Sequence, residues 1–221
     1  HGLAIGWDLN GVKISEENYK EGSLHGLAIG WDLNGVKISE QNYKDNKLDG
    51  LAIGWDEDGQ KNWEKSYING KLTNLINHYY YDNGNKSLIE SYQDGVLHGK
   101  VIGWDEDGQK RWERSYKEGK KDGKWTWWYK NGLKETVKNF KDNRLNGTTT
   151  FWYESGQISQ QGNYKDGKID GKWTWWNKTG QIRTVQIGET KFNYYITGVK
   201  ESEENYKDNK LDGLAIGWDE D

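Results

Sequence analysis

The sequence has no cysteine, no proline and no methionine among its 221 residues, and only 3 phenylalanines. The missing cysteine excludes a disulfide framework and any thiolate metal site. It leaves the compartment open, because a secreted protein can also lack cysteine. No apolar run approaches the roughly 20 residues of a transmembrane helix, so the sequence carries no strong membrane signal.

The sequence also lacks a large excess of either positive or negative charge. The 31 Lys and Arg residues face 35 Asp and Glu residues, which gives a formal net charge of −4, and both signs recur along the whole chain. No basic patch stands out, so we expect no nucleic-acid partner. What is abundant is glycine, tryptophan and tyrosine, with 29, 14 and 14 residues. Disordered chains are poor in aromatic residues, so aromatics spaced by glycine indicate short strands and tight turns.

The chain repeats itself with a period of about 24 residues, which is the signature of a repeat architecture. The repeats start near residues 2, 26, 50, 74, 99, 123, 147, 171, 189 and 213. One extra residue in the repeat at 74 accounts for a spacing of 25, and a loop shortened to Ile187–Thr190 accounts for the closer spacing near 189. The fifth residue after each start is aromatic: Trp7, Trp31, Trp55, Tyr79, Trp104, Trp128, Trp152, Trp176, Tyr194 and Trp218.

Each period has the pattern of a β-hairpin. A strand such as Leu3–Asp8 runs into a turn that ends in glycine, and a return strand such as Val12–Tyr19 leads to a longer polar turn, Lys20–Gly26. The predicted fold is all-β: an elongated antiparallel meander of about nine 24-residue β-hairpin repeats that forms a curled single-sheet ribbon. We expect one array over residues 1–221, and we expect it to be part of a longer chain.

The stretches "GKWTWWYKNG" (123–132) and "NYKDGKIDG" (163–171) resemble the bacterial variant of the MORN repeat, the type found in antitoxin-like proteins. The resemblance covers the whole chain, although the "LAIGWD" repeats depart from the aromatic-rich pattern. It implies a curled sheet of hairpins used for binding or scaffolding, with no catalytic residues to carry over.

Alternation along a strand places Leu3, Ile5 and Trp7 on one face of the sheet. This ladder face carries the predicted structural ladder: Trp7, Trp31, Trp55, Trp104, Trp128, Trp152, Trp176 and Trp218. The other tryptophans fall on the opposite face. If the short turn covers the sixth to ninth residues, the second residue of a repeat lies across from the thirteenth. Trp63 and Trp112 then face Ala52 and Val101, while Trp125 and Trp173 face Thr136 and Thr184.

Under the same register Trp127 and Trp175 face Lys134 and Ile182. Two interpretations stay open for these tryptophans. They pack on one another, or they form a partly exposed aromatic strip that anchors a partner. The candidate binding residues are Trp125, Trp127, Trp173, Trp175, Trp63 and Trp112.

Catalytic and metal sites are not indicated. Three of the four histidines, His1, His25 and His98, precede a repeat start where other repeats have Asp or Asn, which is typical of a turn residue. The acidic "WDEDG" stretches lack the 12-residue spacing of a calcium loop. We therefore expect no cofactor, no metal and no enzymatic activity.

The sequence predicts a non-enzymatic scaffold that binds another macromolecule, most plainly a protein. The alternatives are a carbohydrate or cell-wall binding module and an antitoxin or immunity-like protein that neutralises a dedicated toxin. Both ends of the sequence carry an unprotected first strand, "HGLAIGWDLN" and "DGLAIGWDED", so end-to-end self-association between copies is a further expectation.

Overall fold

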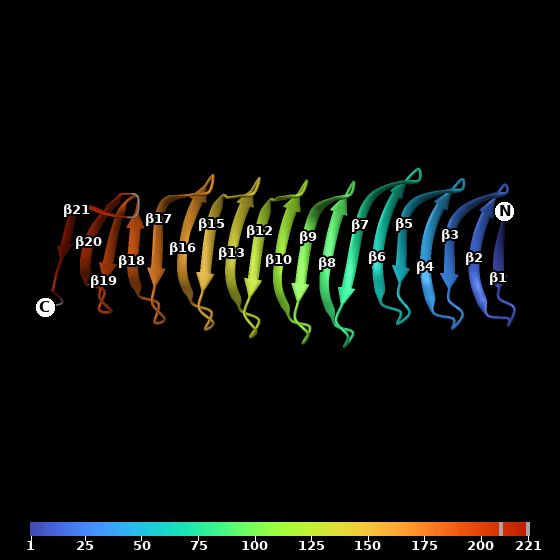
Figure 1. Ribbon diagram of the computed structural model, residues 1–221, viewed down its shortest axis with the longest axis horizontal. Coiled ribbons are helices and arrows are strands. Elements are labelled where there is room, and N and C mark those ends of the chain that lie inside the picture. The colour runs from blue at the N-terminus through green and yellow to red at the C-terminus, as the bar shows by residue number, and fades with distance from the viewer. Residues whose placement is uncertain (208–209, 220–221) are drawn as a thin grey trace. The chain divides into compact units, whose positions relative to one another are not determined.

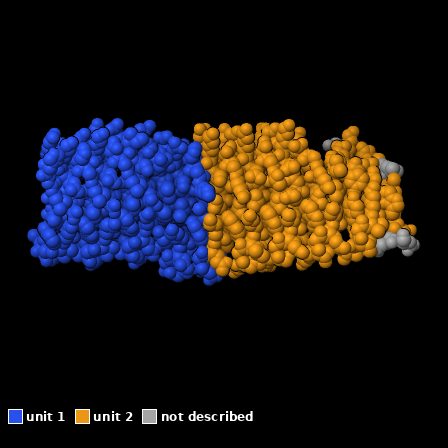
Figure 2. All heavy atoms as spheres, turned by 180° about the vertical axis from the view of Figure 1, so that it is seen from behind, with its two compact units in different colours: residues 1–108 blue, residues 109–221 orange. Residues whose placement is uncertain are grey.

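A computed structural model describes residues 1–207 and 210–219. Its regular structure consists of β-strands, and each strand pairs antiparallel with a neighbour in sequence (Figure 1). The chain divides into two compact units, unit 1 with residues 1–108 and unit 2 with residues 109–221 (Figure 2). Among the described residues there is no helix, and so none long and apolar enough to cross a membrane. The predicted all-β hairpin meander is confirmed.

Nine strands make up the sheet of unit 1. They are β1 (Gly2–Trp7), β2 (Lys13–Lys20), β3 (Ser23–Trp31), β4 (Lys37–Lys44), β5 (Lys47–Trp55), β6 (Lys61–Ile68), β7 (Lys71–Tyr80), β8 (Lys86–Gln93) and β9 (Val96–Trp104). Those described in unit 2 are β10 (Lys110–Lys117), β11 (Lys120–Lys121), β12 (Gly123–Trp128), β13 (Lys134–Lys141), β14 (Arg144–Leu145), β15 (Gly147–Trp152), β16 (Ile158–Lys165), β17 (Lys168–Trp176), β18 (Ile182–Ile187), β19 (Thr190–Tyr194), β20 (Lys200–Lys207) and β21 (Lys210–Gly217).

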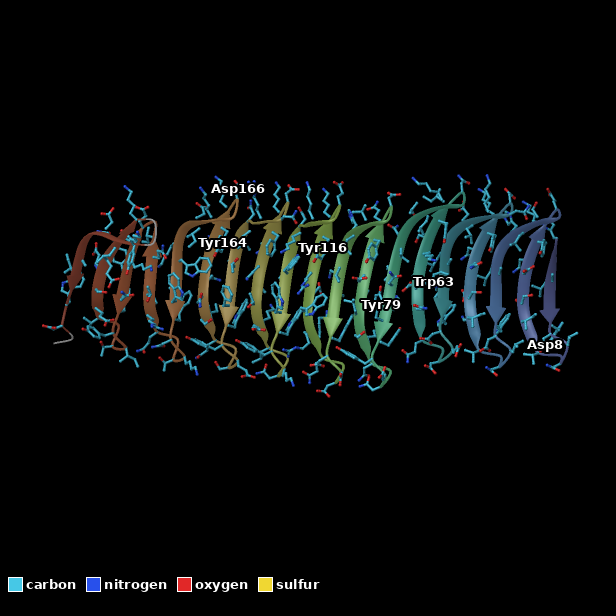
Figure 3. All side chains as sticks on the ribbon, in the orientation of Figure 1. Asp8, Trp63, Tyr79, Tyr116, Tyr164 and Asp166 are labelled. Carbon is cyan, nitrogen blue, oxygen red and sulfur yellow. The ribbon has the colours of Figure 1, made fainter. Side chains whose placement is uncertain are left out.

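Short loops built on Asp, Tyr or, at residue 177, Asn connect the strands along one edge of each unit. In the first loop the Gly11 N–H donates to the Asp8 carbonyl oxygen at 3.2 Å, and Gly11 takes a φ of 80° that favours glycine. The Asp8 carboxylate accepts hydrogen bonds from the backbone N–H of Val12 (2.7 Å) and of Asn10 (2.9 Å). The Val12 bond is the main cause that lowers the pKa of Asp8. Asp8 marks this edge in Figure 3.

The other edge carries tight two-residue turns instead of the predicted longer ones. In the first of them Lys20 pairs with Ser23, and the two residues between them both have positive φ, as a type I′ turn requires. The same pattern recurs at Glu21–Gly22, Asp45–Asn46, Asn69–Gly70, Asp94–Gly95, Glu118–Gly119, Asp142–Asn143 and Asp166–Gly167. The prediction of a long turn over Lys20–Gly26 is therefore wrong, and His25, expected in that turn, lies in strand β3.

Seven of the glycines that start repeats are strand residues with positive φ: Gly26, Gly50, Gly99, Gly123, Gly147, Gly171 and Gly213. Gly26 and Gly50 have φ of 97° and 106°, and the strand register shifts opposite both of them. At each site the side-chain Nδ2 of an asparagine donates to a strand carbonyl, from Asn18 to Leu27 (2.7 Å) and from Asn42 to Leu51 (2.8 Å). These glycines therefore form β-bulges, which positive φ also permits, and they do not form turns.

The hairpin register differs by two residues from the predicted one. Trp127, and not Trp125, pairs with Thr136, and Trp63 pairs with Gly54 instead of Ala52. The cause is a pair of irregularities, the bulged glycine of the short loop and a register shift between the fourth and fifth residues of each repeat. Two shifts of one residue keep every side chain on its predicted face, because the side-chain period of a strand is two.

The corrected register gives new partners for the other tryptophans as well. Trp125 pairs with Lys138, and Trp173 pairs with Gln186. Trp175 takes the partner predicted for Trp173, Thr184. The residues predicted to face Trp127 and Trp175, Lys134 and Ile182, pair with Trp128 and Trp176: Trp128↔Lys134 and Trp176↔Ile182.

Two repeats depart from the regular period. As the sequence predicts, the loop is shortened, and Ile187 pairs with Thr190 across it. Tyr194 takes the predicted aromatic position, because it pairs with Lys200 in the way that Trp7 pairs with Lys13. In the repeat near 74 the predicted aromatic is wrong. Tyr80, and not Tyr79, pairs with Lys86, because the extra residue lengthens β7 to 10 residues.

Candidate functional site

The ladder face combines tryptophan, lysine and glutamate. The Lys37 ammonium lies 4.2 Å from the ring centre of Trp55 in the next repeat and 2.9 Å from Glu40. The same arrangement joins Lys13 to Trp31 and Glu16, Lys110 to Trp128 and Glu113, and Lys200 to Trp218 and Glu203. The lysines of these four groups are therefore already paired with carboxylates.

Tyrosines tie successive repeats of the ladder face together at the short-loop edge. The hydroxyl of Tyr129 donates to the Trp152 carbonyl oxygen at 2.6 Å, and that of Tyr153 donates to the Trp176 carbonyl oxygen at 2.7 Å. Where Asp8 stands at this position, its carboxylate instead closes its own loop. The predicted ladder is therefore joined by hydrogen bonds as well as by ring–lysine contacts.

The opposite face of unit 2 holds most of the candidate binding residues. Burial divides them into two sets, a buried layer and a half-buried layer. Trp125 and Trp173 are buried, with 5% and 4% of their surface exposed. Trp112, Trp127 and Trp175 are half-buried. Of the two interpretations that the sequence left open, packing therefore holds for Trp125 and Trp173.

Aromatic neighbours bury Trp125 and Trp173. The ring of Trp125 lies 5.3 Å from Tyr116 and 4.9 Å from Phe140, and that of Trp173 lies 5.2 Å from Tyr164. Tyr116 and Tyr164 lie on the strands between the two loop edges (Figure 3). The Trp125 indole N–H donates to the Ser115 carbonyl oxygen at 2.9 Å, whereas that of Trp173 finds no acceptor among the described residues.

The half-buried residues form one row across the strands, which we call the aromatic row: Trp112, Trp127, Phe151 and Trp175. The cross-strand pairs run Trp112↔Trp127, Trp127↔Thr136, Thr136↔Phe151, Phe151↔Gln160 and Gln160↔Trp175. Trp127 and Trp175 are four strands apart, or about 19 Å at the usual strand spacing. Sequence reasoning missed Phe151, although it holds the same repeat position as Trp127.

Unit 1 offers a different surface at the same positions. Gly30 and Gly54 take the place of Trp127, and Ser39 lies between them. Trp63 is the one candidate binding residue in this unit (Figure 3); its indole covers Gly54, where an added Cβ would lie 2.5 Å from Nε1. Lys65 lies 4.2 Å above the same ring.

The two units also differ in charge, so the expectation of evenly spread charge is wrong. Residues 1–108 hold 10 Lys and Arg against 18 Asp and Glu, a net charge of −8. Residues 109–221 hold 21 against 17, a net charge of +4, and all four arginines lie there. The aromatic row thus belongs to the basic unit.

Unit 1 contains a buried histidine, His78. The Nε2 of His78 lies 3.0 Å from Glu64, and its Nδ1 is buried without a partner among the described residues. Burial is the main influence on this imidazole and lowers its pKa, against the opposing pull of Glu64. No group of three or more His, Cys, Asp or Glu residues within the described ranges could hold a metal ion. The carboxylate of Asp56 in the first "WDEDG" stretch closes its own loop through the Gln60 N–H at 2.8 Å.

Three segments match the family model of the MORN repeat variant, residues 24–45, 121–142 and 145–166. The second and third span parts of unit 2 that contain Trp125, Trp127 and Phe151. No curated protein matches the chain. MORN-type segments on a repeat-rich β fold suggest a scaffold or binding role.

Solved structures give distant likenesses. A TcdB2–TccC3 structure is 11% identical over 97% of this chain and 14% of its own, with a TM-score of 0.35. A GtfA/B complex bound to UDP and GlcNAc is 14% identical over 54% of this chain and 23% of its own, with a TM-score of 0.23. The Photorhabdus luminescens Tc holotoxin pore is 13% identical over 90% of this chain and 15% of its own, with a TM-score of 0.23. The chain thus spans less than a quarter of each, and likenesses this distant carry no argument about function.

Proposed function

We propose that the chain is a non-enzymatic scaffold that binds a protein partner through the opposite face of unit 2. The observation that carries the proposal is the aromatic row. Trp112, Trp127, Phe151 and Trp175 lie half-buried in one row across the strands. The buried rings of Trp125 and Trp173 lie beside Trp127 and Trp175, each 5.9 Å away between ring centres, and support their positions. Residues held in this way lose little side-chain entropy when a partner covers them.

The composition of this face supports a protein as the partner. Binding hot spots in protein interfaces are enriched in Trp, Tyr and Arg, and this face combines Trp112, Trp127 and Trp175 with Arg114 and Tyr116. A catalytic role is not part of the proposal, because residues 109–221 contain no histidine and no cysteine to supply the usual nucleophile or base.

The test is a pull-down from the native host with mass spectrometry, using the full chain and two double variants. Trp127→Thr with Trp175→Thr removes two anchors of the aromatic row and leaves the buried layer intact. The matched control, Trp31→Thr with Trp55→Thr, removes two ladder residues of unit 1. Circular dichroism must show that all three proteins are folded.

We expect one or more proteins to be captured by the wild type and by the control, and to be lost with the Trp127/Trp175 variant. Capture of the same proteins by all three would refute the aromatic row as the binding face. Release of the captured material by soluble glycans would instead favour a carbohydrate-binding module.

A further inference from the structure

Three cations stand over the aromatic rings of unit 2, and we call them the cationic cluster: Arg114, Lys121 and Lys138. The guanidinium carbon of Arg114 lies 4.2 Å from the ring centre of Trp112, 5.1 Å from Trp125 and 5.9 Å from Trp127. One side chain therefore contacts three indoles from two adjacent strands, β10 and β12. Such cation–π contacts hold a charged group in place without neutralising its charge.

The two lysines continue this pattern along the face. The Lys121 ammonium lies 4.8 Å from the ring centre of Trp125 and 5.4 Å from Phe140. The Lys138 ammonium lies 5.7 Å from Trp127 and 5.4 Å from Phe151. Lys138 thus bridges two members of the aromatic row.

The cationic cluster has no carboxylate of its own within the described part of unit 2. Several ladder-face lysines next to tryptophans pair with glutamates, as Lys37 does with Glu40 and Lys110 with Glu113. Arg114, Lys121 and Lys138 make no such ion pair, and the Nε of Arg114 is buried without an acceptor. The three positive charges of the cationic cluster are therefore not neutralised by an ion pair within the described residues, and carboxylates of a partner could supply one.

The wider charge distribution has the same sign. Residues 109–188, which carry the aromatic row, hold 17 Lys and Arg against 8 Asp and Glu, a net charge of +9. A positive field over this segment raises the encounter rate with acidic partners and repels basic ones. Local geometry and overall charge therefore both favour an anionic ligand.

We propose that the cationic cluster and the aromatic row together bind an extended acidic segment of a protein, with carboxylates on the cations and apolar side chains on Trp175. This rests on the function proposed above and names the chemistry of the partner. The guanidinium of Arg114 offers the paired donors that match a carboxylate. Nucleic acid fits less well, because base stacking needs free ring faces and the cations already lie over the indoles of Trp112 and Trp127.

The test measures fluorescence anisotropy of labelled 12-residue peptides with the full chain. One probe alternates glutamate and tyrosine, and the other alternates glutamine and tyrosine. The variant combines Arg114→Gln with Lys138→Gln. The matched control is Lys65→Gln, which removes a cation that lies 4.2 Å above Trp63 in the acidic unit. A 12-nucleotide adenine RNA and vesicles of anionic phospholipid compete in parallel, and circular dichroism confirms the fold of each variant.

We expect the glutamate peptide to bind the wild type and Lys65→Gln equally, and to bind the double variant at least tenfold more weakly. We expect its affinity for the wild type to fall as salt is raised, and Arg114→Lys to recover part of the loss. The inference is overturned if the glutamine peptide binds as tightly as the glutamate peptide, if the double variant binds like the wild type, if the glutamate peptide does not bind at all, or if RNA or vesicles bind more tightly.

The experiments distinguish a failure of the acidic-ligand proposal from a failure of the aromatic row as the protein-binding face. Equal binding of both peptides that is lost in the Trp127→Thr and Trp175→Thr variant would leave the aromatic row as a protein-binding face and remove the requirement for acid. Charge-dependent binding that survives this variant would keep the acidic ligand and place it on the cations alone.

Discussion

The opposite faces of the two units show one backbone pattern with two surfaces. In unit 1 the cross-strand position of Ser39 lies between Gly30 and Gly54, and in unit 2 the same position, Thr136, lies between Trp127 and Phe151. The cross-strand pairs are equivalent, so both sets fit the same strand register. What differs is the charge and the aromatic area offered to a partner. The comparison teaches that one strand register accommodates glycine and serine at these positions in unit 1 and aromatic residues in unit 2.

The largest expected loss of stability comes from removing a ring of the buried layer in unit 2. Trp125→Ala and Trp173→Ala each remove a ring that is at least 95% buried, and we expect the free energy of unfolding to fall by about 3–5 kcal/mol. Trp127→Ala and Trp175→Ala remove half-buried rings, and we expect a loss of about 1.5 kcal/mol. Urea denaturation measures both, and hydrogen exchange locates the effect in unit 2. Equal losses for the two pairs would contradict the two-layer arrangement.

A smaller loss of stability is expected when one methyl group is added beneath a tryptophan ring. A Cβ at Gly162 would lie 2.5 Å from Cδ2 of Trp173, so we expect Gly162→Ala to cost about 2 kcal/mol. At Gly30 the added Cβ would meet only the rotatable Ser39 hydroxyl at 2.6 Å, and we expect Gly30→Ala to cost less than about 1 kcal/mol. Thermal or urea unfolding compares them. In a Trp173→Thr background the cost of Gly162→Ala must shrink, and an unchanged cost would show that the ring is not its cause.

The indole N–H groups of the two buried tryptophans give a sharper comparison, because only that of Trp125 has an acceptor among the described residues. Trp125→Phe removes the donor to the Ser115 carbonyl oxygen and leaves that acceptor to find a new partner, which costs about 1–2 kcal/mol. Trp173→Phe removes an N–H that has no acceptor among the described residues, so we expect no loss from hydrogen bonding. Urea midpoints of the two variants decide the matter. The account fails here if Trp173→Phe is the more damaging change.

Lowering the pH should destabilise unit 1 more than unit 2, by a modest amount. Burial lowers the pKa of His78 in unit 1 below the usual 6.5, so its neutral form is favoured in the folded state. The stability linked to this group is therefore present above pH 6.5 and lost as the pH falls. Residues 109–221 contain no histidine. Hydrogen exchange between pH 7.5 and 5.5, corrected for intrinsic rates, should show unit 1 weakening through this group.

The matched variants for this titration are His78→Gln and His1→Gln. We expect the first to reduce the extra acid sensitivity of unit 1 and the second, at an exposed position, to leave it unchanged. Identical acid profiles for His78→Gln and the wild type would contradict the role given to this imidazole.

The period and the faces of the strands could be predicted from the sequence because both depend on side-chain spacing alone. Turn types and register could not. A glycine with positive φ serves a turn or a bulge equally well, so Gly26 carried no signal that separated the two. The register then moved by two residues and gave Trp127 and Trp175 the partners expected for Trp125 and Trp173. Tyr80 was missed because the extra residue of β7 lies before the aromatic position and moves that position on by one residue.

The candidate site was predicted in part. The aromatic residues of the opposite face follow from alternation, but their division into a buried and a half-exposed layer depends on which neighbours flank each ring. Trp125 lies between Tyr116 and Phe140 only because the bulges set that register. The cationic cluster was missed for a different reason. The overall charge of −4 conceals a basic unit next to an acidic one.

The most direct test of the account is fluorine NMR of the full chain labelled with 5-fluorotryptophan, recorded while the glutamate–tyrosine peptide is added. Single Trp→Phe variants assign the resonances. The account predicts that the signals of Trp112, Trp127 and Trp175 shift with the peptide, while those of Trp31 and Trp55 on the ladder face of unit 1 stay in place. Shifts confined to Trp31 and Trp55, or no shift at the aromatic row when the peptide is bound, would contradict it.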